Sequence, residues 1–153
     1  METDWHNPMM LITCYSMTGD EDLRRRAAKT TLERAERAIA KDPTDGPALA
    51  AGANALANVG EKERALEWIR RALLLDPDNL VMRYNLGCAL IRDIGDFDEA
   101  VETFQPFFEK LQSPMHLRHL EADPDLDLIR DDERFNEMLC AARKRLGMTA
   151  TSA

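Results

Sequence analysis

A pattern that recurs after 34 residues constrains this chain more than any other feature of its sequence. The dipeptide Asp42-Pro43 returns as Asp76-Pro77, and Leu56 has its counterpart in Leu90. A fixed period of 20–50 residues is typical of arrays in which each unit stacks on its neighbours. Such arrays present an extended surface. The pattern therefore predicts a binding surface rather than a reaction centre.

The segment 45–77 contains two amphipathic patterns joined at Gly60. Apolar residues three or four positions apart predict two helices, each with one buried stripe. Ala53, Ala65 and Ala72 fall where the helices must touch, and packed helix axes lie only about 8–10 Å apart. The larger apolar residues that fill the spaces between are Leu49, Leu56, Leu66, Trp68, Ile69 and Leu73.

A further copy of the pattern runs from about residue 79 to 111. Leu86-Gly87 lies on its first predicted helix, and Gly95 marks the turn to the second. Ala65 and Ala100 are 35 residues apart rather than 34, so this copy contains one extra residue. We place the insertion at 92–94, just before the turn.

Length and charge narrow the class of protein. The chain has 153 residues and a net charge of −8, which fits one soluble helical domain and disfavours nucleic acid as a partner, because like charges repel. Residues 21–41 are rich in Lys and Arg, whereas 93–133 are strongly acidic. These charges either solvate helix faces or attract each other, within one chain or between chains.

The cysteines and the apolar runs indicate the cellular compartment of the protein. Cys14, Cys88 and Cys140 are far apart and form no CxxC motif, which fits reduced thiols in the cytosol. The run 9–12 is too short for a secretory core, and no stretch of about 18 apolar residues is present. We therefore expect a cytoplasmic protein without a membrane partner.

The sequence contains no pattern that indicates catalysis. Asp123, Asp125 and Asp127 suggest calcium, but Leu128 and Arg134 replace the Gly and Glu of an EF-hand loop. His116 and His119 lack a third zinc ligand at a recognisable spacing. We predict that the protein is not an enzyme and that it has no catalytic residue, no metal site and no cofactor.

Pro106 interrupts the second helix of the copy at 79–111. Proline removes one backbone hydrogen bond and clashes with the preceding turn, so we expect a kink or a break at Gln105. Two adjacent phenylalanines, Phe107 and Phe108, cannot easily face one core. Either both pack inward, or one is exposed and forms a surface for assembly.

The spacing of Leu86-Gly87, Ala100 and the Asp-Pro pair at 76–77 resembles the tetratricopeptide repeat. In the first full unit, Gly52-Ala53 replaces the usual Leu-Gly pair. The resemblance implies an all-α fold, a short right-handed α-solenoid of helical hairpins with a C-terminal capping helix. The predicted parts are an N-terminal segment with a remnant helix at 1–19, repeats over 20–112 (a half unit at 20–43 and full units at about 45–77 and 79–111), a cap at 113–147 and a disordered tail at 148–153.

The tail carries a second resemblance. The run from Leu120 to Phe135, with Asp123-Pro124-Asp125-Leu126-Asp127 at its centre, is similar to the C-terminal tetratricopeptide region of bacterial class III adenylate cyclases and related signalling proteins. Leu128 and Glu133 stand where that family usually has Pro. The chain has no room for a cyclase catalytic domain. The resemblance therefore implies a bacterial interaction or regulatory module.

The family pattern also indicates where a ligand would bind. The first helix of each unit lines the concave face, which places Asn54, Asn58, Tyr84, Cys88 and Arg92 in the groove. The amides can bind a peptide backbone, Tyr84 offers a flat apolar contact, and Arg92 can pair with a carboxylate. We predict a non-catalytic scaffold that binds a peptide or partner protein. The alternative is a dimerisation or regulatory element of a larger cyclase-like signalling system, acting through self-association as a homodimer.

Overall fold

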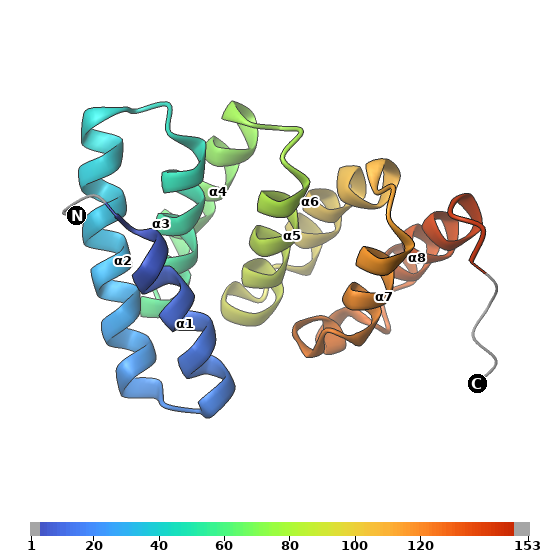
Figure 1. The fold of residues 1–153 in the computed structure, drawn as a ribbon, viewed down its shortest axis with the longest axis horizontal. Helices are drawn as coiled ribbons and strands as arrows, with labels where there is room; N and C mark the ends of the chain where they lie inside the picture. Colours follow the sequence, from blue (N-terminus) through green and yellow to red (C-terminus); the bar gives the residue numbers. More distant parts are fainter. Residues whose placement is uncertain (1–3, 149–153) are drawn as a thin grey trace. The chain divides into compact units, whose positions relative to one another are not determined.

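The computed structural model describes residues 4–148 and is helical throughout, with no strand in that range. The chain folds into two compact units, residues 1–77 and 78–153. Each unit is built of antiparallel helical hairpins (Figure 1). The predicted all-α fold of helical hairpins is confirmed.

The first unit contains two hairpins. The helices are α1 (His6–Thr18), α2 (Glu21–Lys41), α3 (Gly46–Val59) and α4 (Lys62–Leu75). Each helix packs along the next one in sequence, so that α2 lies against both α1 and α3. In Figure 1, α1 to α4 are coloured from blue to green.

The helices of the first unit begin and end where local chemistry dictates. Asp20 caps α2 by accepting a hydrogen bond from the Leu23 amide (3.1 Å), and the Asp45 carboxylate accepts one from the Ala48 amide (2.9 Å). These side chains satisfy amide groups that have no partner inside the helix. Gly60 ends α3 with a φ of 88°, a conformation that favours glycine.

Small residues form the helix contacts of the first unit. Ala53, Ala65 and Ala72 are fully buried, as the repeat pattern predicted. Gly52 lies directly under the Trp68 ring, and a Cβ atom there would stand 2.3 Å from Cζ3 of the indole. A side chain at residue 52 would therefore require the Trp68 ring to move.

The second unit contains the other six elements of the described chain. They are α5 (Leu80–Ala89), the π-helical turn η1 (Leu90–Ile94), α6 (Phe97–Lys110), α7 (Pro114–Ala122), the 3-10 helix η2 (Pro124–Ile129) and α8 (Glu133–Arg145). Asn79, Asp96, Ser113 and Asp132 cap α5, α6, α7 and α8 with their side chains.

The π-helical turn accounts for the extra residue in the second full copy of the pattern. The Leu90 carbonyl accepts hydrogen bonds from the Gly95 amide (2.7 Å) and the Asp96 amide (3.0 Å). A π-helical turn closes a loop one residue longer than an α-helical turn, and such turns often lie at functional positions. The predicted insertion at 92–94 falls within η1.

Helix α6 corrects one expectation. We expected Pro106 to kink the helix or to break it at Gln105; the break does not occur, because α6 is continuous from Phe97 to Lys110. Proline lacks the amide that the turn would use, so the helix loses one internal bond there. Helix α6 packs against both α5 and α8.

Phe107 and Phe108 are both buried, so they do not form an exposed surface. The Phe107 ring lies 5.6 Å from that of Tyr84 on α5, whereas the Phe108 ring lies 5.4 Å from that of Phe135 on α8. Neighbouring residues on a helix point about 100° apart. Because α6 has partners on two sides, both rings find a core.

Helix α8 closes the second unit. The Arg145 guanidinium donates hydrogen bonds to the carbonyl oxygens of Phe108 (2.5 Å) and Leu111 (2.7 Å), which are acceptors without partners at the C-terminal end of α6. Arg143 pairs with Glu121 of α7 at 2.5 Å. The predicted disordered tail lies, from residue 149 on, outside the described residues.

Candidate partner-binding surfaces

Asn54 and Asn58 lie one turn apart on α3. The Asn58 amide donates to the Asn54 carbonyl oxygen (2.9 Å) and to its side-chain oxygen (3.0 Å), and its own oxygen accepts a hydrogen bond from Arg24 of α2. Asn58 is buried, whereas Asn54 is half-buried. Asn58 thus ties α3 to α2, and Asn54 is the more accessible of the two.

Tyr84 on α5 is bound by the chain itself. Its hydroxyl donates a hydrogen bond to the Asp123 carboxylate, and its ring packs against Phe104 and Phe107. Burial and the neighbouring carboxylate raise the pKa of Tyr84 well above its ordinary value. The phenol is therefore a permanent hydrogen-bond donor at physiological pH.

Arg92 in the turn η1 binds two carboxylates. It donates to Asp125 at 2.7 Å and to Asp93 at 2.9 Å. Burial opposes its charged form, but the two carboxylates more than compensate and leave the pKa of the guanidinium above its ordinary value. The site therefore holds a fixed positive charge that is already paired.

Cys88 lies one turn from both Tyr84 and Arg92. It is buried, and burial together with the charges of Asp123 and Asp125 raises the pKa of its thiol to about 12. The thiol is therefore protonated and unreactive at neutral pH. Cys14 and Cys140 are exposed.

The segment that meets these residues was not part of the predicted site. Residues 123–127 start the 3-10 helix η2, and Asp123 caps it by accepting a hydrogen bond from the Asp125 amide (2.9 Å). Asp127 pairs with Arg130 at 2.7 Å. All three carboxylates of the suspected calcium motif thus have protein partners. The sequence signal for this contact was the acidic run of Asp123, Asp125 and Asp127, whose charge is opposite to that of Arg92.

The described residues form neither a metal site nor a membrane-spanning helix. His116 and His119 are both exposed on α7. Within residues 4–148, no group of three His, Cys, Asp or Glu side chains is placed to hold a metal ion. In the same range, no helix is both long and apolar enough to cross a membrane.

The structure groups the five predicted residues into two sets. Asn54 and Asn58 lie together on α3 of the first unit, and Tyr84, Cys88 and Arg92 lie together on α5 and η1 of the second. The second set is bonded to the chain's own segment 123–125. A ligand that used Tyr84 or Arg92 would have to exchange with those carboxylates.

One comparison with known proteins bears on this arrangement. The tetratricopeptide repeat family model matches residues 48–79. The α3–α4 hairpin is thus similar to a tetratricopeptide repeat. Repeats of this family generally mediate interactions between proteins and are typically non-catalytic. The match does not extend to residues 120–135, and no curated protein matches the chain.

Proposed function

We propose that this chain is a non-catalytic interaction module of the cytoplasm that binds a peptide segment of a partner protein, without cofactor or nucleic acid. The observation that carries the proposal is the family match over α3 and α4. The α3 face supplies a suitable site, because Asn54 is only half-buried and can bond to a peptide backbone.

Tyr84, Cys88 and Arg92 form a separate candidate surface on α5 and η1 of the second unit. Their polar groups are occupied by Asp123 and Asp125, which offer the same carboxylate chemistry as an acidic ligand. The binding free energy of a ligand at this site is therefore only the difference between its own contacts and the carboxylate contacts that it displaces. We expect the α3 face to bind first.

The alternative is self-association in a bacterial signalling system of the cyclase type. Phe107 and Phe108 cannot supply the predicted contact between copies, because both rings are buried. Light scattering across a concentration series tests this alternative. If the chain forms a homodimer, and variants that dissociate the dimer also lose peptide binding, the result would favour self-association over the peptide-binding module.

The proposal is tested by selecting peptides from a displayed random library with the whole chain. We compare the selected peptides on the variants Asn54→Arg and Leu74→Arg, since Leu74 is 81% exposed on α4 and receives the same added charge. Binding should weaken about tenfold or more in the first variant, equivalent to about 1.4 kcal/mol, and stay unchanged in the second. Failure to select any peptide, or equal binding to both variants, would contradict the proposal.

A further inference from the structure

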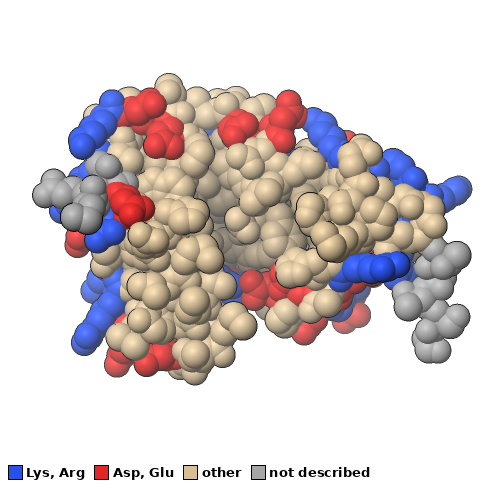
Figure 2. Space-filling model, viewed as in Figure 1, with Lys and Arg blue, Asp and Glu red and all other residues tan. Residues whose placement is uncertain are grey.

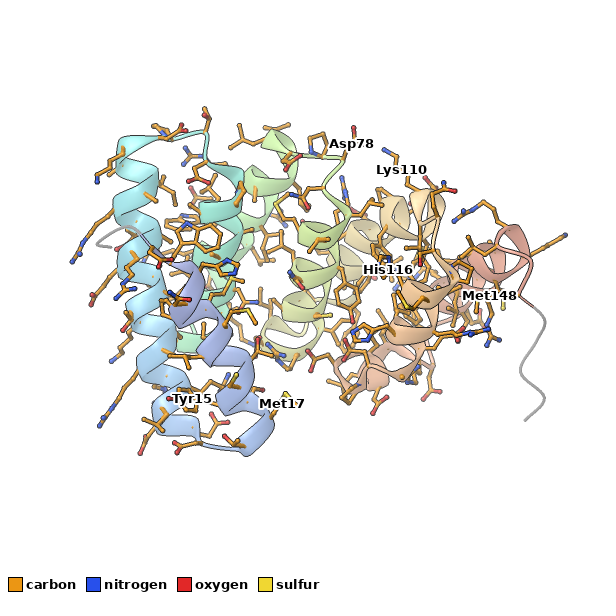
Figure 3. All side chains as sticks on the ribbon, in the orientation of Figure 1. Tyr15, Met17, Asp78, Lys110, His116 and Met148 are labelled. Atoms are coloured by element: carbon orange, nitrogen blue, oxygen red, sulfur yellow. The ribbon has the colours of Figure 1, made fainter. Side chains whose placement is uncertain are left out.

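A groove between α1 and α2 lies apart from the residues described above. Its volume is about 340 Å³, within the range of about 300–1,000 Å³ that is common for ligand sites. Its lining includes Asn7, Leu11, Tyr15, Leu23, Arg26 and Arg34. Figure 3 shows Tyr15 near the C-terminal end of α1, next to α2.

Helix α1 exposes large apolar side chains that the rest of the first unit does not cover. It contains no Asp, Glu, Lys or Arg, yet only Pro8 and Ile12 are buried. Met10 and Leu11 are about half exposed, and Met17 is 85% exposed. Large apolar side chains that lie together on a protein surface often mark an interaction site. Figure 2 shows an uncharged area over α1.

The charged groups at the groove are basic. Arg26 and Arg34 line it, and no carboxylate does. Arg34 donates one hydrogen bond to the Asp4 carbonyl oxygen at 2.7 Å, and the Asp4 carboxylate accepts from Asn7 and the His6 amide. Helix α2 as a whole carries seven Lys and Arg residues against four Asp and Glu. In a chain with a net charge of −8, this surface has the opposite sign.

We propose that the α1–α2 groove binds an acidic amphipathic segment of a partner protein. An aliphatic or aromatic anchor of the partner enters between Leu11 and Leu23, and its carboxylates pair with Arg26 and Arg34. Helical segments bind apolar grooves through residues at i, i+3, i+4 and i+7, and charge complementarity sets their specificity. This surface is separate from the α3 face, so either site can bind if the other does not.

The probe is a labelled amphipathic peptide with Leu and Phe at helical spacing and Glu at its other positions. A second peptide has Lys in place of every Glu. The whole chain should bind the Glu peptide at least about tenfold more tightly than the Lys peptide, and added salt should weaken the binding. Equal binding of the two peptides, or no binding of the Glu peptide, would overturn the proposal.

Two matched pairs of variants locate the site. Leu11→Glu and Arg26→Glu should each weaken binding about tenfold or more. Met17→Glu, on the same helix as Leu11, and Arg37→Glu, on the same helix as Arg26, should change it by less than about twofold. All four positions are exposed, so the variants should fold, which circular dichroism verifies.

Three other results would overturn the proposal. Weakening by Asn54→Arg alone would assign the peptide to the α3 face. A dimer in light scattering that Leu11→Glu dissociates would assign the groove to a second copy of the chain. Preferential binding of a fatty acid that is lost in Leu11→Glu would assign it to a lipid.

Discussion

At the scale of single residues, the contact between Tyr84 and Asp123 has the clearest consequence. It joins α5 to the segment before η2 across 39 positions of sequence, and the phenol has a charged acceptor. Hydrogen bonds to charged groups contribute about 1.5–3 kcal/mol. This contact, together with Arg92 and Asp125, holds the 123–127 segment against α5.

Replacing Tyr84 with Phe removes this hydrogen bond and leaves one oxygen of Asp123 without its donor. We expect the free energy of unfolding in urea to fall by about 1.5–3 kcal/mol. Tyr15→Phe is the control, because the Tyr15 hydroxyl has no hydrogen bond among residues 4–148 and its loss should change stability little. Equal effects of the two substitutions would argue against the contact.

The three cysteines should differ in reactivity. Cys14 and Cys140 are exposed, whereas Cys88 is buried and its thiol pKa is raised to about 12. In a thiol assay on the native chain at mildly alkaline pH, two thiols should react quickly. The third should react only after denaturant is added. A fast third thiol, absent from Cys88→Ser, would show that the α5 face opens readily.

At the scale of elements, the close approach of α5 and α6 depends on Gly87. A Cβ atom there would lie 2.4 Å from Cζ of Phe104, whose ring is fully buried against Phe108 and Phe135. A ring held on several sides has little room to move, so a substitution forces strain into the core.

Gly87→Ala should therefore destabilise the protein by about 1–3 kcal/mol in thermal or urea unfolding, despite the better helix propensity of Ala. Gly52→Ala is the comparison, because its Cβ would also meet a ring, that of Trp68, but this ring is half-buried rather than fully buried; the other contact is the Ala35 Cβ at 3.2 Å. We expect a smaller loss there. A larger loss at Gly52 than at Gly87 would contradict the packing described for α6.

The start of α8 should make stability depend on pH. Asp132 caps the helix, and the Arg134 guanidinium holds the pKa of the Asp132 carboxyl down to about 2, from an ordinary value of 3.8. Because the folded pKa is lowered, this contribution is fully present above about pH 4. It is lost as the pH falls from about 4 to about 2.

The variant Asp132→Asn retains a capping side chain but not the charge. The wild type should be more stable than this variant at pH 7, and the difference should shrink as urea unfolding is repeated toward pH 3. Asp131→Asn provides the control for a neighbouring charge. A difference that stays constant with pH would show that the carboxylate charge does not stabilise α8.

At the scale of the whole molecule, the sequence predicted what depends on local chemistry. The burial of Ala53, Ala65 and Ala72 follows from residue size and from the 34-residue period, and the structure has it. The extra residue at 92–94 was detectable by counting, although its form as a π-helical turn was not.

Contacts between distant segments could not be predicted in this way. Nothing near Tyr84 in sequence indicates that Asp123 binds it, because the contact exists only once α7 has returned the chain to α5. Similarly, the sequence left open whether Phe107 and Phe108 both pack inward, because the neighbour of Phe108, Phe135, comes from α8. The pairing of Asn58 with Arg24 likewise depends on how α2 packs against α3.

The central claim is that the chain binds a protein segment through the first unit, while its own 123–127 segment is bonded to Tyr84 of α5 and Arg92 of η1. Amide chemical-shift mapping of the full chain, titrated with a library-selected peptide, tests this most directly. We predict shifts in α1, α2 or α3 and none in α5, with α5 responding only when Asp123 and Asp125 are both changed to Asn. Shifts confined to α5 and η1 of the wild type, or no shifts in either unit, would contradict the account.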